Sequence, residues 1–174
     1  MKDDLVSELK LHIPTLDELW FYQSMLSDPA TMSYNAKWFP PDGCIPFPKG
    51  RWAEWHKAWT GNEPERFYAY LQRISDGVFV GDVNYHYDKD SDAWEIGILI
   101  SAPERGKGYG RMGLELLTAR AFETDGVTRL VNIFEPTRTA ARRIHWECGF
   151  TETASDDGLI RLTLTKEDHI RSLT

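Results

Sequence analysis

Apolar and polar residues alternate along several short stretches of this 174-residue chain, and a period of two is typical of strands that bury one face. The first stretch ends at Pro14, which lacks the N–H group that a strand ladder needs. Two later stretches are joined by a turn sequence at residues 75–77. We expect strands over residues 9–13, 65–74, 78–87, 94–100, 130–134, 150–154 and 159–164.

Apolar residues spaced three and four apart predict helices between these strands. Thr15 is a typical N-cap, and Glu18 three residues later completes a capping box. Trp52, Trp55 and Trp59 share one helix face, which favours core packing for all three. The predicted helices cover residues 15–26, 51–59, 110–124 and 137–147.

The alternation also assigns the side chains of two strands to faces, because successive side chains of a strand point to opposite sides of the sheet. In the strand over residues 94–100, Glu95, Gly97 and Leu99 share a face, opposite Trp94, Ile96, Ile98 and Ile100. In the strand over residues 78–87, Phe79, Val83, Tyr85 and Tyr87 share a face, opposite Val78, Val80, Asp82, Asn84 and His86.

These elements predict an α/β (α+β) fold in a single domain over residues 1–174. We expect a mixed, mostly antiparallel sheet of six or seven strands with helices on both faces. The exception is the segment over residues 28–50, where the density of prolines argues against a regular helix or a central strand. A loop of this length in a small domain is more often functional than idle.

The formal net charge of −7 argues against nucleic acid as a partner, because lysine and arginine dominate binding to phosphates. The acidity is concentrated in the third and fourth predicted strands and the turns that precede them, at Asp76, Asp82, Asp88, Asp90, Asp92 and Glu95. This pattern is compatible with a solvated acidic hairpin, and also with a field that attracts cationic amines.

No apolar run approaches the roughly 20 residues that cross a bilayer, so we expect no membrane partner. Residues 1–4 lack the basic and apolar blocks of a secretory signal. Cys44 and Cys148 fit neither a disulfide framework nor a zinc site. We therefore expect a reducing, cytoplasmic location and no bound metal.

The strongest chemical signal is the sequence Arg105-Gly106-Lys107-Gly108-Tyr109-Gly110 between a predicted strand and a predicted helix. Alternating glycines allow a ligand to approach the backbone closely, and the N–H groups of such a turn can converge on an anion. The helix that follows adds the positive end of its dipole. The spacing differs from that of a nucleoside-triphosphatase loop and from that of a dinucleotide-binding fold.

With the preceding strand, this turn resembles the acetyl-CoA-binding motif of the GCN5-related N-acetyltransferase (GNAT) superfamily. The stretches over residues 136–141 and 144–150, the second ending in Gly149-Phe150, resemble the second landmark of this family. The resemblance covers residues 77–166, and the motif over residues 93–97 is similar to the ribosomal-protein and polyamine acetyltransferase branches. It implies the acetyltransferase fold and acetyl-CoA (coenzyme A) as cosubstrate.

In that family the turn binds the pyrophosphate of coenzyme A through backbone N–H groups. The resemblance assigns this role to Arg105, Gly106, Lys107, Gly108, Tyr109 and Gly110, and it implies that the side chains of Arg105 and Lys107 add positive charge nearby. It also implies that the preceding strand splays from its neighbour, so that backbone amides of Ile98, Leu99 and Ile100 contact the acetyl carbonyl. Arg138 occupies a position that is commonly asparagine, and Arg138 with Arg142 could pair with a phosphate or form a solvated basic face.

Glu95 is the leading general-base candidate, because it lies on the strand that would carry the acetyl group and an ammonium must lose a proton before it attacks. A surface role for Glu95 fits its strand equally well, and Glu135 is a second candidate. His145 takes the place of a tyrosine that protonates the leaving thiolate, although a packed core histidine fits its helix too. Further acid–base candidates are Tyr85, His86 and Tyr87.

The resemblance therefore predicts an acetyl-CoA-dependent N-acetyltransferase that acts on a small-molecule or peptide amine. Trp38 and Phe39, with the three tryptophans of the predicted second helix, could wall the acceptor pocket. Members of the family commonly dimerise, so a homodimer is compatible with the sequence. The alternative is a catalytically silent acyl-CoA-binding sensor or regulatory module, which the unusual residues Arg138 and His145 leave open.

Overall fold

The computed structural model describes residues 7–155 and 157–174. Residues 1–4, in which the sequence shows no features of a secretory signal, lie outside the described part of the chain. Within it the strands are β1 (Leu9–His12), β2 (Arg66–Arg73), β3 (Phe79–Asp88), β4 (Ala93–Ile100), β5 (Arg129–Phe134), β6 (Thr151–Ala154) and β7 (Ile160–Thr165). The α-helices are α1 (Trp20–Leu26), α2 (Pro29–Met32), α3 (Trp52–Trp59), α4 (Tyr109–Ala119), α5 (Thr139–Glu147) and α6 (Lys166–Ser172).

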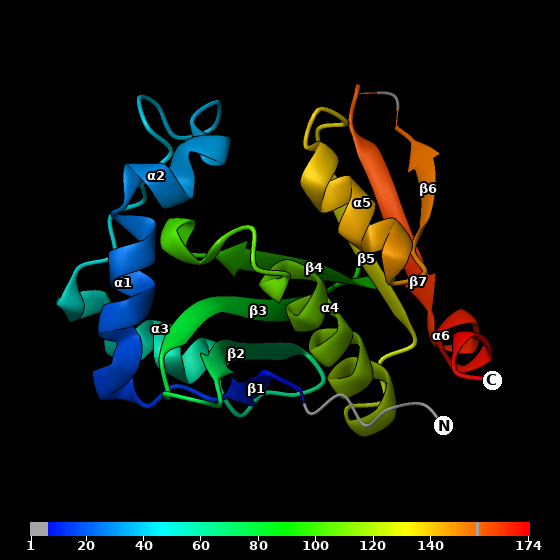
Figure 1. The fold of residues 1–174 in the computed structure, drawn as a ribbon, viewed down its shortest axis with the longest axis horizontal. Coiled ribbons are helices and arrows are strands. Elements are labelled where there is room, and N and C mark those ends of the chain that lie inside the picture. Colours follow the sequence, from blue (N-terminus) through cyan, green and yellow to red (C-terminus); the bar gives the residue numbers. More distant parts are fainter. Residues whose placement is uncertain (1–6, 156) are drawn as a thin grey trace.

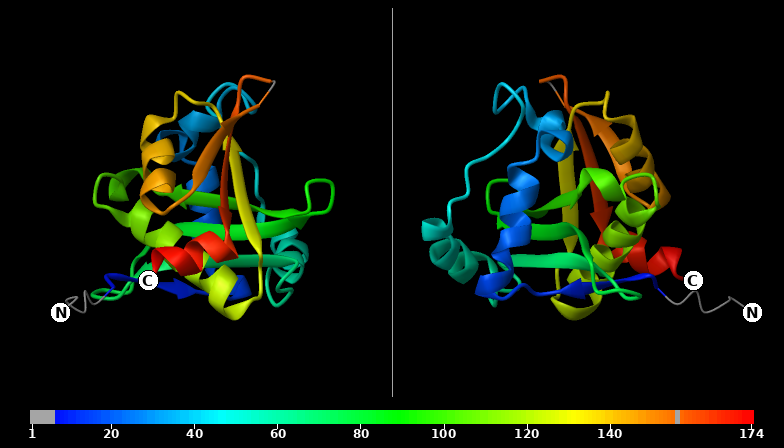
Figure 2. Two further views of the ribbon diagram at one scale, coloured as in Figure 1. Left: turned by 90° about the vertical axis from the view of Figure 1, so that its right-hand side faces the viewer. Right: turned by 60° about the vertical axis from the view of Figure 1, so that its left-hand side comes forward.

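The strands form one mixed sheet in the order β1-β2-β3-β4-β5-β7-β6 (Figure 1). Every neighbouring pair is antiparallel except β4 and β5, which run parallel. In Figure 2, left, α4 and α5 lie on one side of the sheet and α3 on the other. The expected architecture, a mostly antiparallel sheet with helices on both faces, is confirmed.

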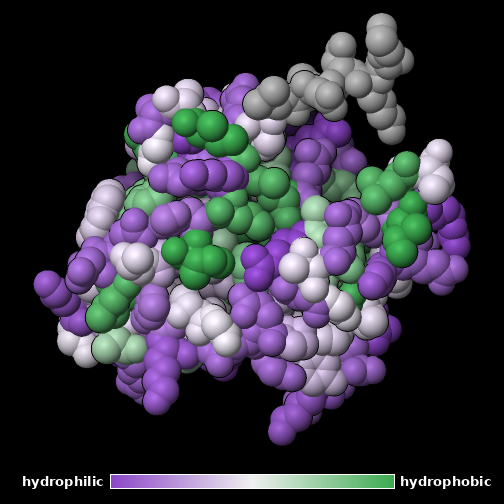
Figure 3. All heavy atoms as spheres, turned by 90° about the horizontal axis from the view of Figure 1, so that it is seen from below, coloured by the Kyte–Doolittle hydropathy of each residue, from purple (hydrophilic) through white to green (hydrophobic). Residues whose placement is uncertain are grey.

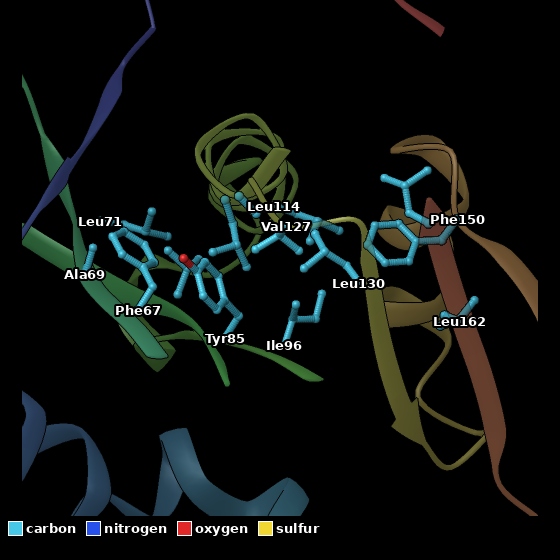
Figure 4. Close-up of a cluster of buried hydrophobic side chains, with 14 of the residues drawn as sticks. Phe67, Ala69, Leu71, Tyr85, Ile96, Leu114, Val127, Leu130, Phe150 and Leu162 are labelled. Carbon is cyan, nitrogen blue, oxygen red and sulfur yellow. The ribbon is translucent and has the colours of Figure 1, made fainter. Parts of the chain in front are cut away.

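The main core lies between α4 and the sheet, and the period-two pattern of the strands explains it. Phe67 and Leu71 of β2 and Tyr85 of β3 are fully buried and point toward Leu114 of α4 (Figure 4). The same core continues to Phe150 beside β6, across the second half of the sheet. Burying these side chains contributes roughly 1.5–3 kcal/mol each relative to full exposure.

The opposite face of the sheet carries an aromatic core. Tyr68 and Tyr70 of β2 pack there against Phe21 and Met25 of α1, and Trp55 and Trp59 of α3 join them. The ring centroids of Trp55 and Tyr68 are 4.6 Å apart in an edge-to-face arrangement, the geometry that aromatic quadrupoles favour. Trp52 is also buried, next to Phe47. The predicted core role of the three α3 tryptophans is therefore confirmed.

One expected strand face is wrong at its beginning, because a β-bulge shifts the register of β2 and β3. Leu71 pairs with Gly81 whereas Gln72 pairs with Phe79, so one residue of β3 is left over. Phe79 consequently packs on the aromatic face beside Tyr70, with ring centroids 4.8 Å apart. Val80 joins Tyr85 in the core below α4. The alternation of apolar and polar residues along the sequence does not reveal such a bulge.

Two helices were not predicted. The proline-rich segment contains the one-turn helix α2, because Pro29 occupies its first turn, where no N–H is needed, and the Asp28 carboxylate accepts hydrogen bonds from the next two N–H groups. At the C-terminal end, the Thr165 side chain accepts a hydrogen bond from the N–H of Asp168 and caps α6. This Thr-x-x-Asp spacing was a readable start signal.

The parallel pair β4 and β5 stays together over only two positions, Trp94 with Leu130 and Glu95 with Val131. Beyond them the strands diverge, and Figure 1 shows β4 turning toward α2 while β5 runs beside α5. The expected splaying of these strands is confirmed. The paired positions of β4 and β5 therefore end before Ile98.

The surface has the polar character expected outside such a core. Figure 3 shows one face on which hydrophilic residues predominate and apolar residues occupy smaller areas among them. In the described part of the chain, no helix combines the length and the apolarity needed to cross a membrane.

Leu114→Ala should lower the free energy of unfolding by about 2–5 kcal/mol, because Leu114 of α4 is fully buried against the sheet and its truncation leaves a cavity. Leu173→Ala is the matched control, since Leu173 is 59% exposed and its truncation should cost within about 0.5 kcal/mol. Urea unfolding of both variants measures the difference. Equal costs would contradict the assigned core.

Candidate functional site

A cavity of about 840 Å³ lies where β4 and β5 diverge. One wall comes from the glycine turn, the start of α4 and the helix α5; the other comes from α1, the segment around α2, and β3. The strand β4 lies between them and contributes residues to the same cavity. Its described lining includes Tyr22, Leu26, Met32, Tyr34, Ile45, Asp82, Asn84, Gly97, Ile98, Leu99, Ile100, Glu104, Arg105, Gly106, Gly108, Tyr109, Gly110, Arg138, Arg143, His145 and Glu147.

The glycine turn forms an open cradle of backbone N–H groups. The φ angles of Gly106 and Gly108 are +77° and +85°, a region that other residues enter only with strain. Gly108 is the N-cap of α4, whose first N–H groups have no partner inside the helix. No described residue accepts a hydrogen bond from the N–H groups of residues 106–110. A Cβ atom at Gly106 would meet no atom within 4 Å, so a ligand can reach this backbone.

The edge of β4 offers backbone groups to the cavity at alternate residues. The N–H of Ser101 donates to the carbonyl of Val80 on β3, so in this antiparallel ladder the odd residues face β3. The N–H groups of Ile98 and Ile100 consequently face the diverging side, toward the cavity. Leu99 lines the cavity with its side chain, and its backbone faces β3. Of the three expected amides, those of Ile98 and Ile100 therefore face the cavity, and that of Leu99 does not.

Arg105 has a structural role in this arrangement. Its guanidinium donates to the carbonyl oxygens of Ile100 (3.1 Å), Ala30 (3.2 Å) and Thr31 (2.7 Å). These bonds join the end of β4 to α2, and they occupy the group that was expected to add charge beside a pyrophosphate. Lys107 is not among the described cavity-lining residues, and its ammonium pairs with Glu104 at 2.8 Å.

The other half of the cavity forms what we call the acceptor chamber, and its described walls are mainly apolar and aromatic. Asp82 is its one acidic residue. The chamber comprises Tyr22, Leu26, Met32, Tyr34, Ile45, Asp82, Asn84 and the side chain of Leu99. The space above Gly97 is filled by the Asn84 side chain, since a Cβ there would lie 2.7 Å from its nitrogen.

Asp82 lies in the middle of β3 and is only 3% exposed. Tyr68 on β2 donates a hydrogen bond of 2.7 Å to one of its carboxylate oxygens. Burial raises the pKa of Asp82 to about 7, and the Tyr68 hydrogen bond partly opposes this. The titratable groups around it are phenols, whose pKa values burial raises first and the Asp82 charge raises further: Tyr22, Tyr34, Tyr68 and Tyr70.

The assignment of Asp82 to a solvated acidic hairpin is therefore wrong, although it holds for exposed residues of the turn such as Asp90. A carboxylate in the interior of a predicted central strand was the signal that could have identified Asp82, because a charge there must be paired or functional.

Glu95 is not among the described residues that line the cavity. Its side chain is 44% exposed, and its carboxylate lies 3.7 Å from Nε2 of His86. Glu135, His86, Tyr85 and Tyr87 are also outside the described lining. The Tyr85 hydroxyl donates to Asp125 and that of Tyr87 to Asp92.

His145 lines the cavity but is fully buried, and both of its ring nitrogens have partners. Nδ1 lies 2.7 Å from the carbonyl oxygen of Ala141, to which it can only donate. Nε2 lies 3.0 Å from the side-chain nitrogen of Asn132 on β5 and accepts its hydrogen bond. Burial lowers the pKa of His145. The geometry is that of a neutral histidine that joins α5 to β5.

Arg138, the N-cap of α5, and Arg142 inside that helix have separate environments. Arg138 lines the cavity, and its guanidinium lies over the rings of Tyr34 at 4.6 Å and Phe134 at 5.0 Å. Arg142 is outside the described lining and pairs with Glu152 at 2.6 Å. Arg143, which the sequence did not single out, lines the cavity with a side chain that is 72% exposed.

Trp38 and Phe39, expected as walls of the acceptor pocket, are 60% and 45% exposed and do not belong to the described lining. Within residues 7–155 and 157–174, no group of three or more histidine, cysteine or acidic residues could hold a metal ion.

A family model for the acetyltransferase (GNAT) domain matches residues 9–151. Among solved structures, the chain is similar to the spermidine N-acetyltransferase from Vibrio cholerae in complex with CoA and spermine. The TM-score is 0.76 at 16% identity, covering 94% of this chain and 99% of that chain. An acetyltransferase (GNAT family) from Bacillus anthracis gives 0.68 at 14% identity, covering 92% and 96%. These likenesses show the fold. No match is found among curated proteins.

Asp82→Asn should change how stability depends on pH. With a folded pKa of about 7 and an unfolded value of about 3.9, the folded state holds a proton that the unfolded state has lost between these pH values. The contribution of Asp82 to wild-type stability therefore falls as the pH rises through this window, and the asparagine variant lacks this contribution. In urea unfolding, the free energy of unfolding of the variant minus that of wild type should therefore rise by about 1–4 kcal/mol from pH 4.5 to pH 8. Parallel curves would contradict a raised pKa.

Proposed function

Because the chain belongs to the acetyltransferase (GNAT) domain family, we propose that it transfers the acetyl group of acetyl-CoA directly to a primary amine in a ternary complex. The observation that carries this proposal is the continuity of the cavity. A single cavity reaches the glycine turn, the free edge of β4 and the buried carboxylate of Asp82. The spermine in the similar Vibrio cholerae structure supports an amine as the class of acceptor.

The described residues fit coenzyme A at the glycine turn. The partnerless N–H groups of residues 106–110 and the positive end of the α4 dipole provide the donors that a pyrophosphate needs. Arg138, the N-cap of α5, and Arg143 within that helix line the cavity. In this proposal they supply the positive charge near the pyrophosphate that the sequence assigns to Lys107 and Arg142. The N–H groups of Ile98 and Ile100 would stabilise negative charge on the acetyl oxygen.

Direct transfer is favoured over a covalent acyl-enzyme by the composition of the lining. The described cavity residues include no cysteine and no serine, so the usual nucleophiles for an acyl-enzyme are missing from it. In direct transfer, the amine nitrogen bonds to the acetyl carbon while the carbon–sulfur bond breaks. Two protons leave the ammonium group: Asp82 takes the first, and the departing thiolate takes the second.

Asp82 replaces Glu95 in this proposal as the general base. It lies inside the cavity, and a pKa near neutrality matches the working pH of a base. Glu95 lies on the same sheet face as Asp82, but it precedes Gly97 by two residues and lies near the hairpin that joins β3 and β4. His145 is proposed as a positioning residue, because neither of its ring nitrogens is free to protonate a thiolate.

Gly108→Ala should weaken acetyl-CoA binding by about tenfold in Kd, because the strained left-handed conformation shifts the N–H cradle. Gly61→Ala is the matched control: its φ is +74°, and the substituted Cβ would meet no atom within 4 Å. Both should lose about 1 kcal/mol of stability, but only Gly108→Ala should lose affinity in calorimetric titration. Equal affinities would count against the glycine turn as the coenzyme site.

Asp82→Asn should lower kcat about 100-fold or more at pH 7, whereas Glu95→Gln should stay within about threefold of wild type. Release of free thiol from acetyl-CoA with a panel of amines measures both. The reverse pattern would restore Glu95 as the base. Normal acetyl-CoA binding without thiol release for any amine would favour the silent acyl-CoA-binding module.

A further inference from the structure

The acceptor chamber contains a single acidic group among its described residues. The cavity has two other lining acids, Glu104 and Glu147, and both lie in the coenzyme half. Glu104 is bound by Arg73 at 3.0 Å and Lys107 at 2.8 Å, and Glu147 lies 3.7 Å from both Arg111 and Arg143. Asp82 is therefore the one lining carboxylate without a cationic partner inside the described protein.

The walls around Asp82 suit an apolar body. Leu26, Met32, Ile45 and the side chain of Leu99 are aliphatic, and Leu26 and Met32 are 5% and 2% exposed. The Tyr22 ring is fixed by its neighbours, with centroid distances of 4.8 Å to Trp55 and 5.4 Å to Tyr68. Such walls contribute affinity by removing apolar surface from water, but they offer no counter-charge.

The charge at the chamber's edge is positive. The Arg138 guanidinium lies 4.6 Å from the centre of the Tyr34 ring, which itself lines the chamber. A bound molecule with one ammonium group can place it at Asp82 and its carbon chain against the aliphatic walls. A second ammonium group would lie against those walls or beside Arg138, and burying a charge without a partner is costly.

Resting on the proposed function, we infer that the acceptor is a small primary amine with one ammonium group on an apolar body, and that the chamber discriminates against diamines and polyamines. Asp82 and Arg138 are its specificity-determining charges. This acceptor class differs from the polyamines, because a flexible polycation needs several carboxylates and the described chamber supplies one.

The test compares hexylamine with 1,6-diaminohexane, which have the same chain and differ by one ammonium group. We expect kcat/KM for hexylamine to be at least about tenfold higher at pH 7.5 and fixed ionic strength, measured by thiol release. Equal or higher values for the diamine would overturn the inference while leaving acetyl transfer to amines intact. Activity only with a peptide amine would also overturn it. If acetyl-CoA does not bind at all, the proposed function fails with it.

Ile45→Glu adds a carboxylate to the chamber. It should lower the ratio of kcat/KM for hexylamine to kcat/KM for 1,6-diaminohexane by at least about fivefold. Ile13→Glu introduces the same change at a site that is 42% exposed and outside the described cavity lining, and should leave the ratio within about twofold. Because Ile45 packs against a core cluster, Arg138→Gln provides a second variant, which should also narrow the ratio. The ratio of two acceptors is insensitive to coenzyme affinity. An unchanged ratio in a folded variant would overturn the inference.

Discussion

The site depends on the short pairing of two parallel strands. β4 and β5 hold each other at only two residue pairs, and everything the cavity offers follows from their separation beyond that point. If the ladder continued, the N–H groups of Ile98 and Ile100 would be consumed by β5, and no ligand could lie between the strands. The separation is maintained from both sides, by Arg105 binding the end of β4 to α2 and by His145 binding α5 to β5.

The second constraint is the cost of a buried carboxylate. Asp82 lies buried in the middle of a central strand, where desolvation favours its neutral form. The structure provides one hydrogen bond from Tyr68 and no positive charge, so the carboxyl group remains poorly compensated. A protein keeps such a group at a functional site more readily than in a packing role. An ammonium group arriving at Asp82 would supply the missing partner.

Much of the fold follows from local patterns. The alternation over β2 and β4 and the apolar period of α4 predicted those elements because neighbouring residues decide them. The glycine turn was equally readable, since positive φ angles at Gly106 and Gly108 require glycine. Features that depend on distant partners could not be predicted in this way. The partners of Arg105 are carbonyls at residues 30 and 31, which no spacing in the sequence relates to it.

The questions that the sequence leaves open at the site have the same origin. Glu95 and Asp82 are both acidic residues on neighbouring strands, and the sequence favours Glu95 because it lies on the strand that would carry the acetyl group. Which of them reaches the cavity depends on where β4 leaves β5 and on how far α1 and the segment around α2 cover the sheet. Likewise, the choice between a catalytic and a packed His145 rests on Asn132 of another strand.

The link between Arg105 and α2 has a consequence for how this protein can diversify. Arg105 donates to main-chain carbonyl oxygens of Ala30 and Thr31, so these hydrogen bonds do not depend on which side chains the segment around α2 carries. Ile45 and Tyr34, which shape the chamber, belong to this same stretch and contribute no strand to the sheet. Substitutions in this segment can therefore change which molecules the chamber accepts, while β4 and the glycine turn keep their geometry.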